Sequence, residues 1–189
     1  MKILKIILII VAVIIAVCIG ITAYYGGFHT VEFATSEQGG EILVYEDFTG
    51  DYSRTGEVTG RVYNKLKNDF GIETTKGFGY YFDNPDLVEA SKCRAQIGCI
   101  LNPSDSGRIE ELSKAFKIRI FPKGQYTFTD FPYKGMASIF VGMMKVYPEY
   151  TKLADTSKAD LKGPLMEIYD VANETITYRI CPCAMLEVE

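Results

Sequence analysis

The N-terminal 28 residues constrain the chain most, because they contain a long uncharged run. No charged residue occurs between Ile6 and Phe28, and most of this run is Ile, Val, Leu and Ala. A helix of about 20 apolar residues spans the hydrocarbon core of a bilayer, which is roughly 30 Å thick. Tyr24 and Tyr25 suit the lipid–water interface at its far end. We therefore assign residues 1–28 to an N-terminal transmembrane anchor that crosses the membrane through Ile3–Tyr25.

A cleaved signal peptide is the alternative interpretation of this run. Its apolar region would be shorter, and no small-x-small cleavage site follows the run, so an uncleaved anchor is favoured. Lys2 and Lys5 precede the span, whereas the first basic residue after it is Arg54. The positive-inside rule then predicts a single-pass membrane protein with a cytoplasmic N-terminus and an extracytoplasmic domain. The opposite orientation stays open.

The remainder of about 160 residues has the size of one domain. The chain has a formal net charge of −4 and no Lys/Arg stripe, which argues against a nucleic-acid partner. His29, the only histidine, lies beside the anchor, so the domain lacks a His-based triad. The five cysteines show no zinc spacing. Cys93 and Cys99 are expected to flank a turn, and Cys181 and Cys183 to share a strand face, as thiols or disulfides. We expect no metal, cofactor or catalytic residue, and a binding domain rather than an enzyme.

The stretch Lys76–Leu101, KGFGYYFDNPDLVEASKCRAQIGCIL, organises the domain. It predicts a strand, a tight Asp-Asn-Pro turn, a short helix and a second strand. Because side chains alternate across a strand, Tyr80 and Phe82 share one face and Tyr81 takes the other. A weaker copy, KGPLMEIYDVANETITYRICP, follows at residues 162–182. In that copy Glu167 occupies a strand position where the first copy has an aromatic residue.

The same order of elements recurs at about 85 residues. The spacing predicts strands over 31–34 and 41–49, a helix over 51–70 that ends at Gly71, a short helix over 108–116, strands over 117–121 and 125–131, a helix over 136–147, and strands over 166–170 and 175–181. The 136–147 helix is expected to turn Ile139, Phe140, Met143 and Met144 inward and to kink or restart at Pro148. We therefore predict an α+β fold: a duplicated β-α-β-β domain over residues 29–189, with repeat one at about 31–103 and repeat two at about 117–183. Two curved antiparallel sheets, backed by helices, would leave a groove along a pseudo-twofold axis.

The strings YYFDNPDLVEASKCRAQIGCIL, GPLMEIYDV and ITYRICP resemble the GyrI-like small-molecule-binding domain of the SOUL/GyrI superfamily. The chain is most similar to a membrane-anchored form that includes a receptor for autophagy of the endoplasmic reticulum and bacterial relatives. The resemblance implies a duplicated β-α-β-β fold with an aromatic groove and one acidic residue, an effector-binding site for amphipathic or cationic molecules. The acidic residue belongs to an E-x-Y element, here Glu167-Ile168-Tyr169. That receptor turns its domain to the cytosol, opposite to the orientation predicted from charge.

Glu167 in an aromatic groove would suit a cationic ligand, because a desolvated carboxylate seeks a partner and ring faces attract positive charge. The candidate ligand-binding residues are Glu167, Tyr45, Tyr80, Phe82, Tyr133, Tyr169 and Tyr178. The alternative is a solvated Glu167 beside core aromatics. Two rival functions stay open: a membrane-tethered adaptor that recruits proteins and has a vestigial groove, and a small hydrolase that uses Glu167 with a tyrosine. An open groove around Glu167 would favour the binder, and a tyrosine hydroxyl within reach of its carboxylate the hydrolase.

Overall fold

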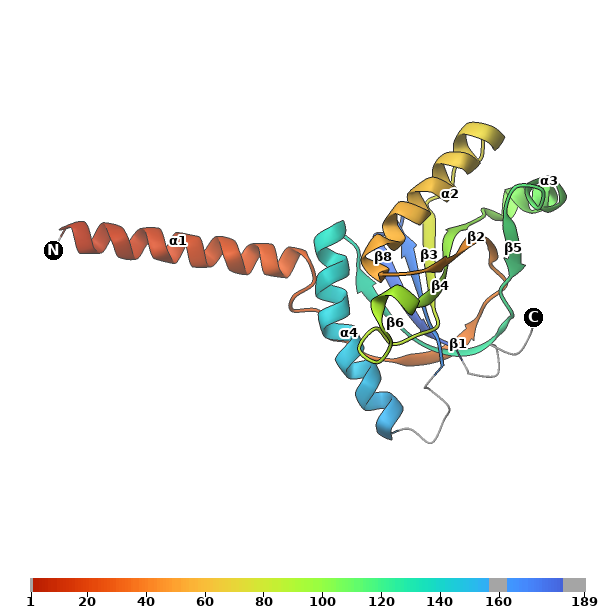
Figure 1. Cartoon of the computed structure of the whole chain (residues 1–189). Coiled ribbons are helices and arrows are strands. Elements are labelled where there is room, and N and C mark those ends of the chain that lie inside the picture. Colours follow the sequence, from red (N-terminus) through yellow and green to blue (C-terminus); the bar gives the residue numbers. More distant parts are fainter. Residues whose placement is uncertain (1, 157–162, 182–189) are drawn as a thin grey trace.

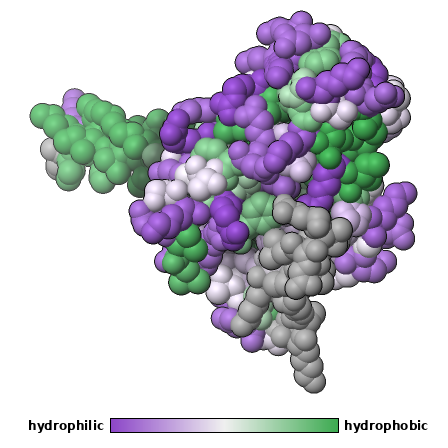
Figure 2. Space-filling model, turned by 45° about the vertical axis from the view of Figure 1, so that its right-hand side comes forward, coloured by the Kyte–Doolittle hydropathy of each residue, from purple (hydrophilic) through white to green (hydrophobic). Residues whose placement is uncertain are grey.

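The computed structural model describes residues 2–156 and 163–181. Its first element, α1 (Lys2–Tyr24), extends away from the remainder of the chain and buries none of its residues against it (Figure 1). The surface of α1 is almost uniformly hydrophobic, whereas the domain surface is mixed and largely hydrophilic (Figure 2). With a mean hydropathy of 3.3, it is the one helix in the described part that is long and apolar enough to cross a membrane, a test that a signal sequence also passes.

Eight strands of the described chain form one antiparallel sheet in the order β1-β6-β8-β7-β3-β4-β2-β5. They are β1 (Ala34–Gln38), β2 (Ile42–Thr49), β3 (Lys76–Tyr81), β4 (Arg94–Ile100), β5 (Lys117–Ile120), β6 (Gly124–Pro132), β7 (Leu165–Asp170) and β8 (Thr175–Ile180). The α+β class is confirmed, but the expectation of two separate sheets is wrong, because β3 and β7 pair along their whole length and join the halves. Strand β1 begins three residues later than expected and pairs with β6 rather than with β2.

Helix α2 (Thr55–Phe70) follows a short 3-10 turn and buries Val58, Val62 and Leu66 at a spacing of four residues. It ends as predicted at Gly71, whose φ of 64° is left-handed and whose N–H bonds to carbonyls of the last turn. Only α3 (Ile109–Leu112) forms in the region expected to be helical over 108–116. The short helix predicted between β3 and β4 is a single 3-10 turn, Ala90–Lys92.

Helix α4 (Met136–Thr156) continues through Pro148, past its expected end. Its buried residues are Ser138, Gly142 and Val146. The prediction that Phe140 and Met144 face inward is wrong, since they are 59% and 78% exposed. The prediction for Ile139 is confirmed, because it packs against the core cluster of Phe131 and Tyr178. Ser138 and Gly142 let the helix approach the sheet closely, since a Cβ on Gly142 would lie 2.4 Å from the Tyr178 hydroxyl.

The two faces of the sheet differ in what covers them. One face, here called the helix face, packs against α2 and α4 and carries Glu167, Tyr169 and Tyr178. The opposite face, here called the open face, carries Phe78, Tyr80, Met166 and Ile168 in a separate core cluster with Phe121 and Tyr126. Alternation along β3 and β7 therefore decides which residues can meet Glu167.

Candidate functional site

Glu167 lies near the middle of the sheet, in β7 between β3 and β8. Its cross-strand partners are Gly79 on one side and Tyr178 on the other. The residue is only 2% exposed, so its carboxylate is removed from water. A buried carboxylate is costly unless donors or a cation compensate it, and the neighbours of Glu167 therefore determine what the site can do.

Two tyrosine hydroxyls compensate this carboxylate. Tyr147 of α4 donates to Glu167 Oε1 at 2.7 Å, and Tyr169, two residues along β7, donates to Oε2. Within residues 2–156 and 163–181, no Lys, Arg or His side chain forms an ion pair with Glu167. The negative charge is thus held by neutral phenols alone.

Two further tyrosines complete what we call the tyrosine cage, defined as Tyr81, Tyr147, Tyr169 and Tyr178. Glycines make room for the two hydroxyls that do not bond to Glu167. A Cβ on Gly79 would lie 2.5 Å from the Tyr81 hydroxyl, and a Cβ on Gly142 would lie 2.4 Å from the Tyr178 hydroxyl. The Tyr178 hydroxyl is buried and has no hydrogen-bond partner in the described chain. The cage therefore contains one donor that the protein does not use.

Burial governs the protonation of this cluster. Desolvation raises the pKa of the Glu167 carboxyl, and the hydrogen bonds from Tyr169 and Tyr147 oppose that rise. Desolvation, followed by the Glu167 charge, raises the pKa of Tyr81, Tyr147, Tyr169 and Tyr178 above their ordinary value. The tyrosines thus stay protonated donors, while the carboxyl is the group whose charge a ligand or a pH change would alter.

The predicted ligand-binding residues divide between the two faces. Glu167, Tyr169 and Tyr178 lie together on the helix face, and the ring of Tyr133 lies 6.1 Å from that of Tyr169. Tyr45, Tyr80 and Phe82 pack on the open face, so one shared groove does not form. Glu167 lines neither the cavity of about 710 Å³ on the open face nor the smaller one beside His29. The carboxylate is enclosed rather than exposed in an open groove.

Sequence reasoning missed Tyr81 and Tyr147. The signal for Tyr81 was the alternation of side chains along β3. Tyr81 lies on the same face as Gly79, which pairs with Glu167, whereas Tyr80 and Phe82 lie on the opposite face. The signal for Tyr147 was the row Ser138–Gly142–Val146, which marks the buried side of α4 next to Tyr147. Both signals depend on the strand pairing and on helix docking.

The open face buries a charge of the opposite sign. Arg179 is 3% exposed and donates to Glu41 through two nitrogens, at 2.6 and 3.2 Å, and to Gln38 at 2.7 Å. Its guanidinium also lies 5.4 Å from the ring centres of Phe121 and Tyr126. A cavity of about 710 Å³, with both polar and apolar lining residues, adjoins this cluster. The charge of Arg179 is thus compensated by groups of the protein, and Arg179, Glu41 and Gln38 also line this cavity.

Other polar groups have structural roles. Arg94 donates to both carboxylate oxygens of Asp83 at 2.9 Å and closes the loop after β3. Cys93 directly precedes β4 and Cys99 lies near the end of that strand, which corrects the expectation that they flank a turn. Cys93, Cys99 and Cys181 are free thiols, and Cys183 lies outside the described residues. Within the described ranges, no three His, Cys, Asp or Glu side chains cluster as metal ligands do.

Comparison with solved structures places the fold among domains of ligand-binding and regulatory proteins. The C-terminal domain of EcmrR matches with a TM-score of 0.52 and 15% identity, over 79% of this chain and 96% of that domain. SAV2435, solved bound to tetraphenylphosphonium, matches with a TM-score of 0.52 and 12% identity, over 79% and 92%. EcmrR in its DNA complex matches with a TM-score of 0.57 and 13% identity, over 79% of this chain and 56% of that one. At such identities the likeness concerns the fold alone.

Among curated proteins, the human Testis-expressed protein 264 is 30% identical over 115 residues, which cover 58% of this chain and 36% of the human protein. Its mouse homolog is 26% identical over 151 residues, which cover 75% and 45%. The chain spans less than half the length of these relatives. No family model matches the chain.

Proposed function

We propose that this chain is a membrane-anchored binding protein for amphipathic cations, with Glu167 as the charge partner. The observation that carries the proposal is a buried carboxylate held only by phenols, with one phenol left unpartnered. A lipophilic cation in this cage would neutralise the carboxylate and place its apolar part against tyrosine rings. SAV2435, which shares the fold, has been solved with such a cation.

The enclosure of Glu167 limits how a ligand could reach it. The carboxylate is covered from α4 by Tyr147, whose hydroxyl occupies one carboxylate oxygen. A bound cation would replace Tyr147 at that position, so binding requires the Tyr147 side chain or its part of α4 to move. Because burial raises the pKa of Glu167, a cation would displace a proton from any protonated fraction. We therefore expect affinity for the cation to increase with pH.

The test is a thermal-shift titration of the full chain in detergent micelles with tetraphenylphosphonium, beside Glu167→Gln. A ligand that binds only the folded state stabilises it by about 2.7 kcal/mol at one hundred times its dissociation constant. Glu46→Gln is the matched control, because this carboxylate lies on the same sheet but pairs with Arg61 at the surface. We expect the stabilisation to disappear in Glu167→Gln and to persist in Glu46→Gln. Equal stabilisation of all three proteins would contradict the assignment of Glu167.

Specific observations also favour the two rival functions. The contact of Tyr147 and Tyr169 with Glu167 is the pairing expected of a hydrolase, and it would be supported by ester hydrolysis that Glu167→Gln abolishes. The enclosed carboxylate favours the adaptor, because a closed site is also what a vestigial groove would look like. If no compound in a panel of lipophilic cations and neutral amphiphiles stabilises the protein, the adaptor becomes the favoured function.

Two structural parts of the proposal have their own support. The strand order reads the same from both ends when β1 to β4 are exchanged with β5 to β8, as a duplicated GyrI-like unit over about 31–103 and 117–183 would produce. The hydropathy of α1 supports a membrane association.

We propose that the N-terminus faces the cytoplasm, and a protease added outside intact cells should then digest the domain. Protection of the domain until the cells are permeabilised would reverse this orientation.

A further inference from the structure

The outward surface of α4 is apolar over its first three turns. Met136, Phe140 and Met144 are 68%, 59% and 78% exposed, and we call these three residues the α4 stripe. They follow one another at intervals of four residues, so they lie on one side of the helix, about 40° apart around its axis. Ala137 and Pro148 are exposed beside them. Three large exposed apolar side chains in a row indicate an interaction surface rather than a solvated face.

The polarity of this surface changes along the helix. Beyond Pro148 the outward positions carry Thr151 and Asp155, both exposed. The apolar part is therefore confined to the half of α4 that contains Lys145. This half is also the part of the domain to which the end of α1 is attached.

Short contacts attach α1 to the domain here. Lys145 of α4 donates from Nζ to the carbonyl oxygen of Gly27 at 2.7 Å, and Gly27 lies three residues beyond the end of α1. His29 Nε2 lies 3.0 Å from the carbonyl oxygen of Asp130, and its ring lies edge-on to Phe131 at 5.1 Å. The α1 terminus is thus bound to α4 and β6 with no long linker between them.

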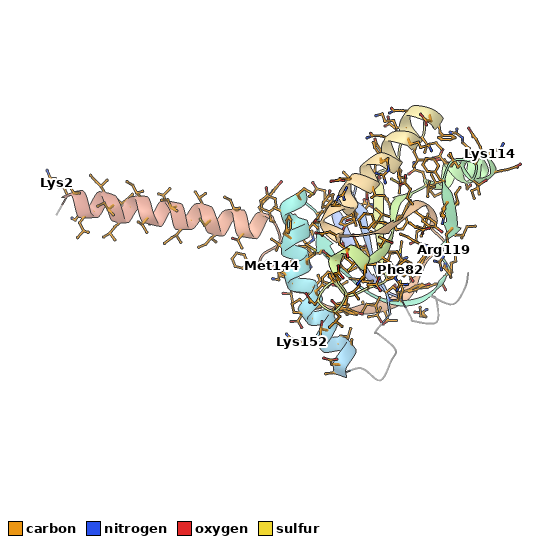
Figure 3. All side chains as sticks on the ribbon, viewed as in Figure 1. Lys2, Phe82, Lys114, Arg119, Met144 and Lys152 are labelled. Atoms are coloured by element: carbon orange, nitrogen blue, oxygen red, sulfur yellow. The ribbon has the colours of Figure 1, made fainter. Side chains whose placement is uncertain are left out.

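The directions of the two helices determine where the α4 stripe faces. Helix α4 runs crosswise to α1, on the flank of the domain from which α1 departs (Figure 1). Met144 and Lys152 lie on the side of α4 turned toward α1, whereas Lys114 and Arg119 lie on the opposite flank of the domain (Figure 3). If α1 crosses a bilayer, α4 lies along the bilayer surface, with the α4 stripe turned toward the lipid.

We propose that the α4 stripe inserts into the interfacial layer of the bilayer that α1 spans. A helix that lies in this layer buries its apolar face about 5–10 Å into the boundary between headgroups and acyl chains. Met144 is adjacent to Lys145, whose contact with Gly27 fixes it near the end of α1 and hence near this boundary. Lys152 is exposed on the same side, where its Nζ pairs with Glu149 Oε1 at 2.6 Å.

The bilayer is favoured over a second copy of the chain as the occupant of this surface. Because Lys145 contacts Gly27 just beyond the end of α1, the bilayer surface always lies close to Met144. A second copy of the chain would have to displace that lipid to reach the stripe. The inference rests on the proposed membrane anchor. The α4 stripe and Tyr147 belong to one helix, and amphipathic ligands concentrate in the layer that the stripe would enter. A ligand would therefore reach the tyrosine cage from the interfacial layer of the bilayer.

The test uses the absence of tryptophan from the chain, so that one introduced Trp is the only indole. The full chain carrying Met144→Trp is reconstituted into phosphatidylcholine vesicles, with and without bromine on the acyl chains. Ile120→Trp is the matched control, since Ile120 is also exposed, at 62%, and lies in β5 next to Arg119 on the far flank. Phe140→Trp is a second reporter in case the first variant does not fold.

We expect bromolipid to quench the indole fluorescence of Met144→Trp and of Phe140→Trp and acrylamide to spare it, with the opposite result for the Ile120→Trp control. Introducing Phe140→Glu into Met144→Trp should restore quenching by acrylamide. A Met144→Trp chain that responds to acrylamide and not to bromolipid would overturn the inference. Fluorescence spared by both quenchers would indicate contact with a second copy and overturn it equally. Alkaline carbonate extraction of the vesicles separates these failures from failure of the anchor, because an unanchored chain leaves the vesicles altogether.

Discussion

The two faces of the sheet each bury one charged side chain, and they compensate it in different ways. On the open face, Arg179 has a carboxylate partner in Glu41, an amide partner in Gln38 and two aromatic rings against its guanidinium. On the helix face, Glu167 has two phenols and no cation within the described chain. Both residues are almost fully buried, so the difference does not come from exposure to solvent.

This difference separates a structural charge from a charge available to a ligand. In a buried ion pair with satisfied hydrogen bonds each charge is already compensated, and removing one member leaves the other uncompensated. A buried carboxylate that only neutral donors hold keeps a net negative charge in a medium of low dielectric constant, where an incoming cation interacts strongly with it. We therefore expect substitutions of Arg179 to act on folding and substitutions of Glu167 to act on binding.

The largest effect should follow from Arg179→Met. This change leaves the Glu41 carboxylate partly buried without its cation, and breaking such a pair costs about 3–5 kcal/mol. Urea unfolding followed by circular dichroism measures the loss. The double variant Arg179→Met/Glu41→Gln removes both charges and should recover part of the stability. If the double variant is no more stable than the single one, the pair does not account for the effect.

Tyr147→Phe should have a smaller effect, and on the other face. It removes one of the two donors to Glu167, and a hydrogen bond to a charged group contributes roughly 1.5–3 kcal/mol. The comparison predicts more than a loss of stability, because the same substitution frees one carboxylate oxygen for a cation. Binding of tetraphenylphosphonium should therefore tighten while unfolding becomes easier. Tyr63→Phe, on α2, is the control and should leave binding unchanged. Weaker binding by Tyr147→Phe would show that the phenol contacts the ligand.

Most of the fold could be predicted from residue spacing, and less of the site could. The four-residue period of Val58, Val62 and Leu66 located α2, and strand patterns located five strands to within about two residues, because each depends on local sequence alone. Whether the halves formed one sheet or two depended on the pairing of β3 with β7, which is a long-range contact. For α4 the apolar residues gave the inward face only in part, since Ile139 packs against the core whereas Phe140 and Met144 lie outward.

The site residues divide in the same way, into those that local sequence identified and those that depended on long-range packing. Glu167 could be chosen because it occupies a strand position where the first copy has an aromatic residue, and because Glu167 and Tyr169 form the E-x-Y element. Tyr80 and Phe82 were chosen as aromatics, but parity places them on the open face, and Tyr81 between them reaches the cage only because Gly79 has no side chain. Residues on α4 could not be assigned to the site before its docking was known.

Tyr178→Phe should have a modest effect of the opposite sign. Its hydroxyl is buried without a partner, and an unsatisfied buried polar group costs about 1–3 kcal/mol. Removing the hydroxyl should therefore raise stability by about 1 kcal/mol, measured by urea unfolding. It should also allow Gly142→Ala, whose new Cβ would otherwise lie 2.4 Å from that oxygen. A loss of stability in Tyr178→Phe would reveal a partner for the hydroxyl and remove it as a free donor for a ligand.

The smallest effect is a difference in pH dependence between two carboxylates. Burial raises the folded-state pKa of Glu167 above its ordinary 4.5, so its contribution to stability is complete below that pH and is lost as the pH rises through the folded-state pKa. Hydrogen bonds from Arg94 lower the folded-state pKa of Asp83 below 3.8, so its contribution is present above 3.8 and is lost as the pH falls through the lower value. Unfolding measured from acid to neutral pH, compared with Glu167→Gln and Asp83→Asn, should therefore give difference curves of opposite slope. If both curves rise with pH, Glu167 is stabilised in its charged form by the protein itself, and a cation would then have little electrostatic advantage to gain at the tyrosine cage.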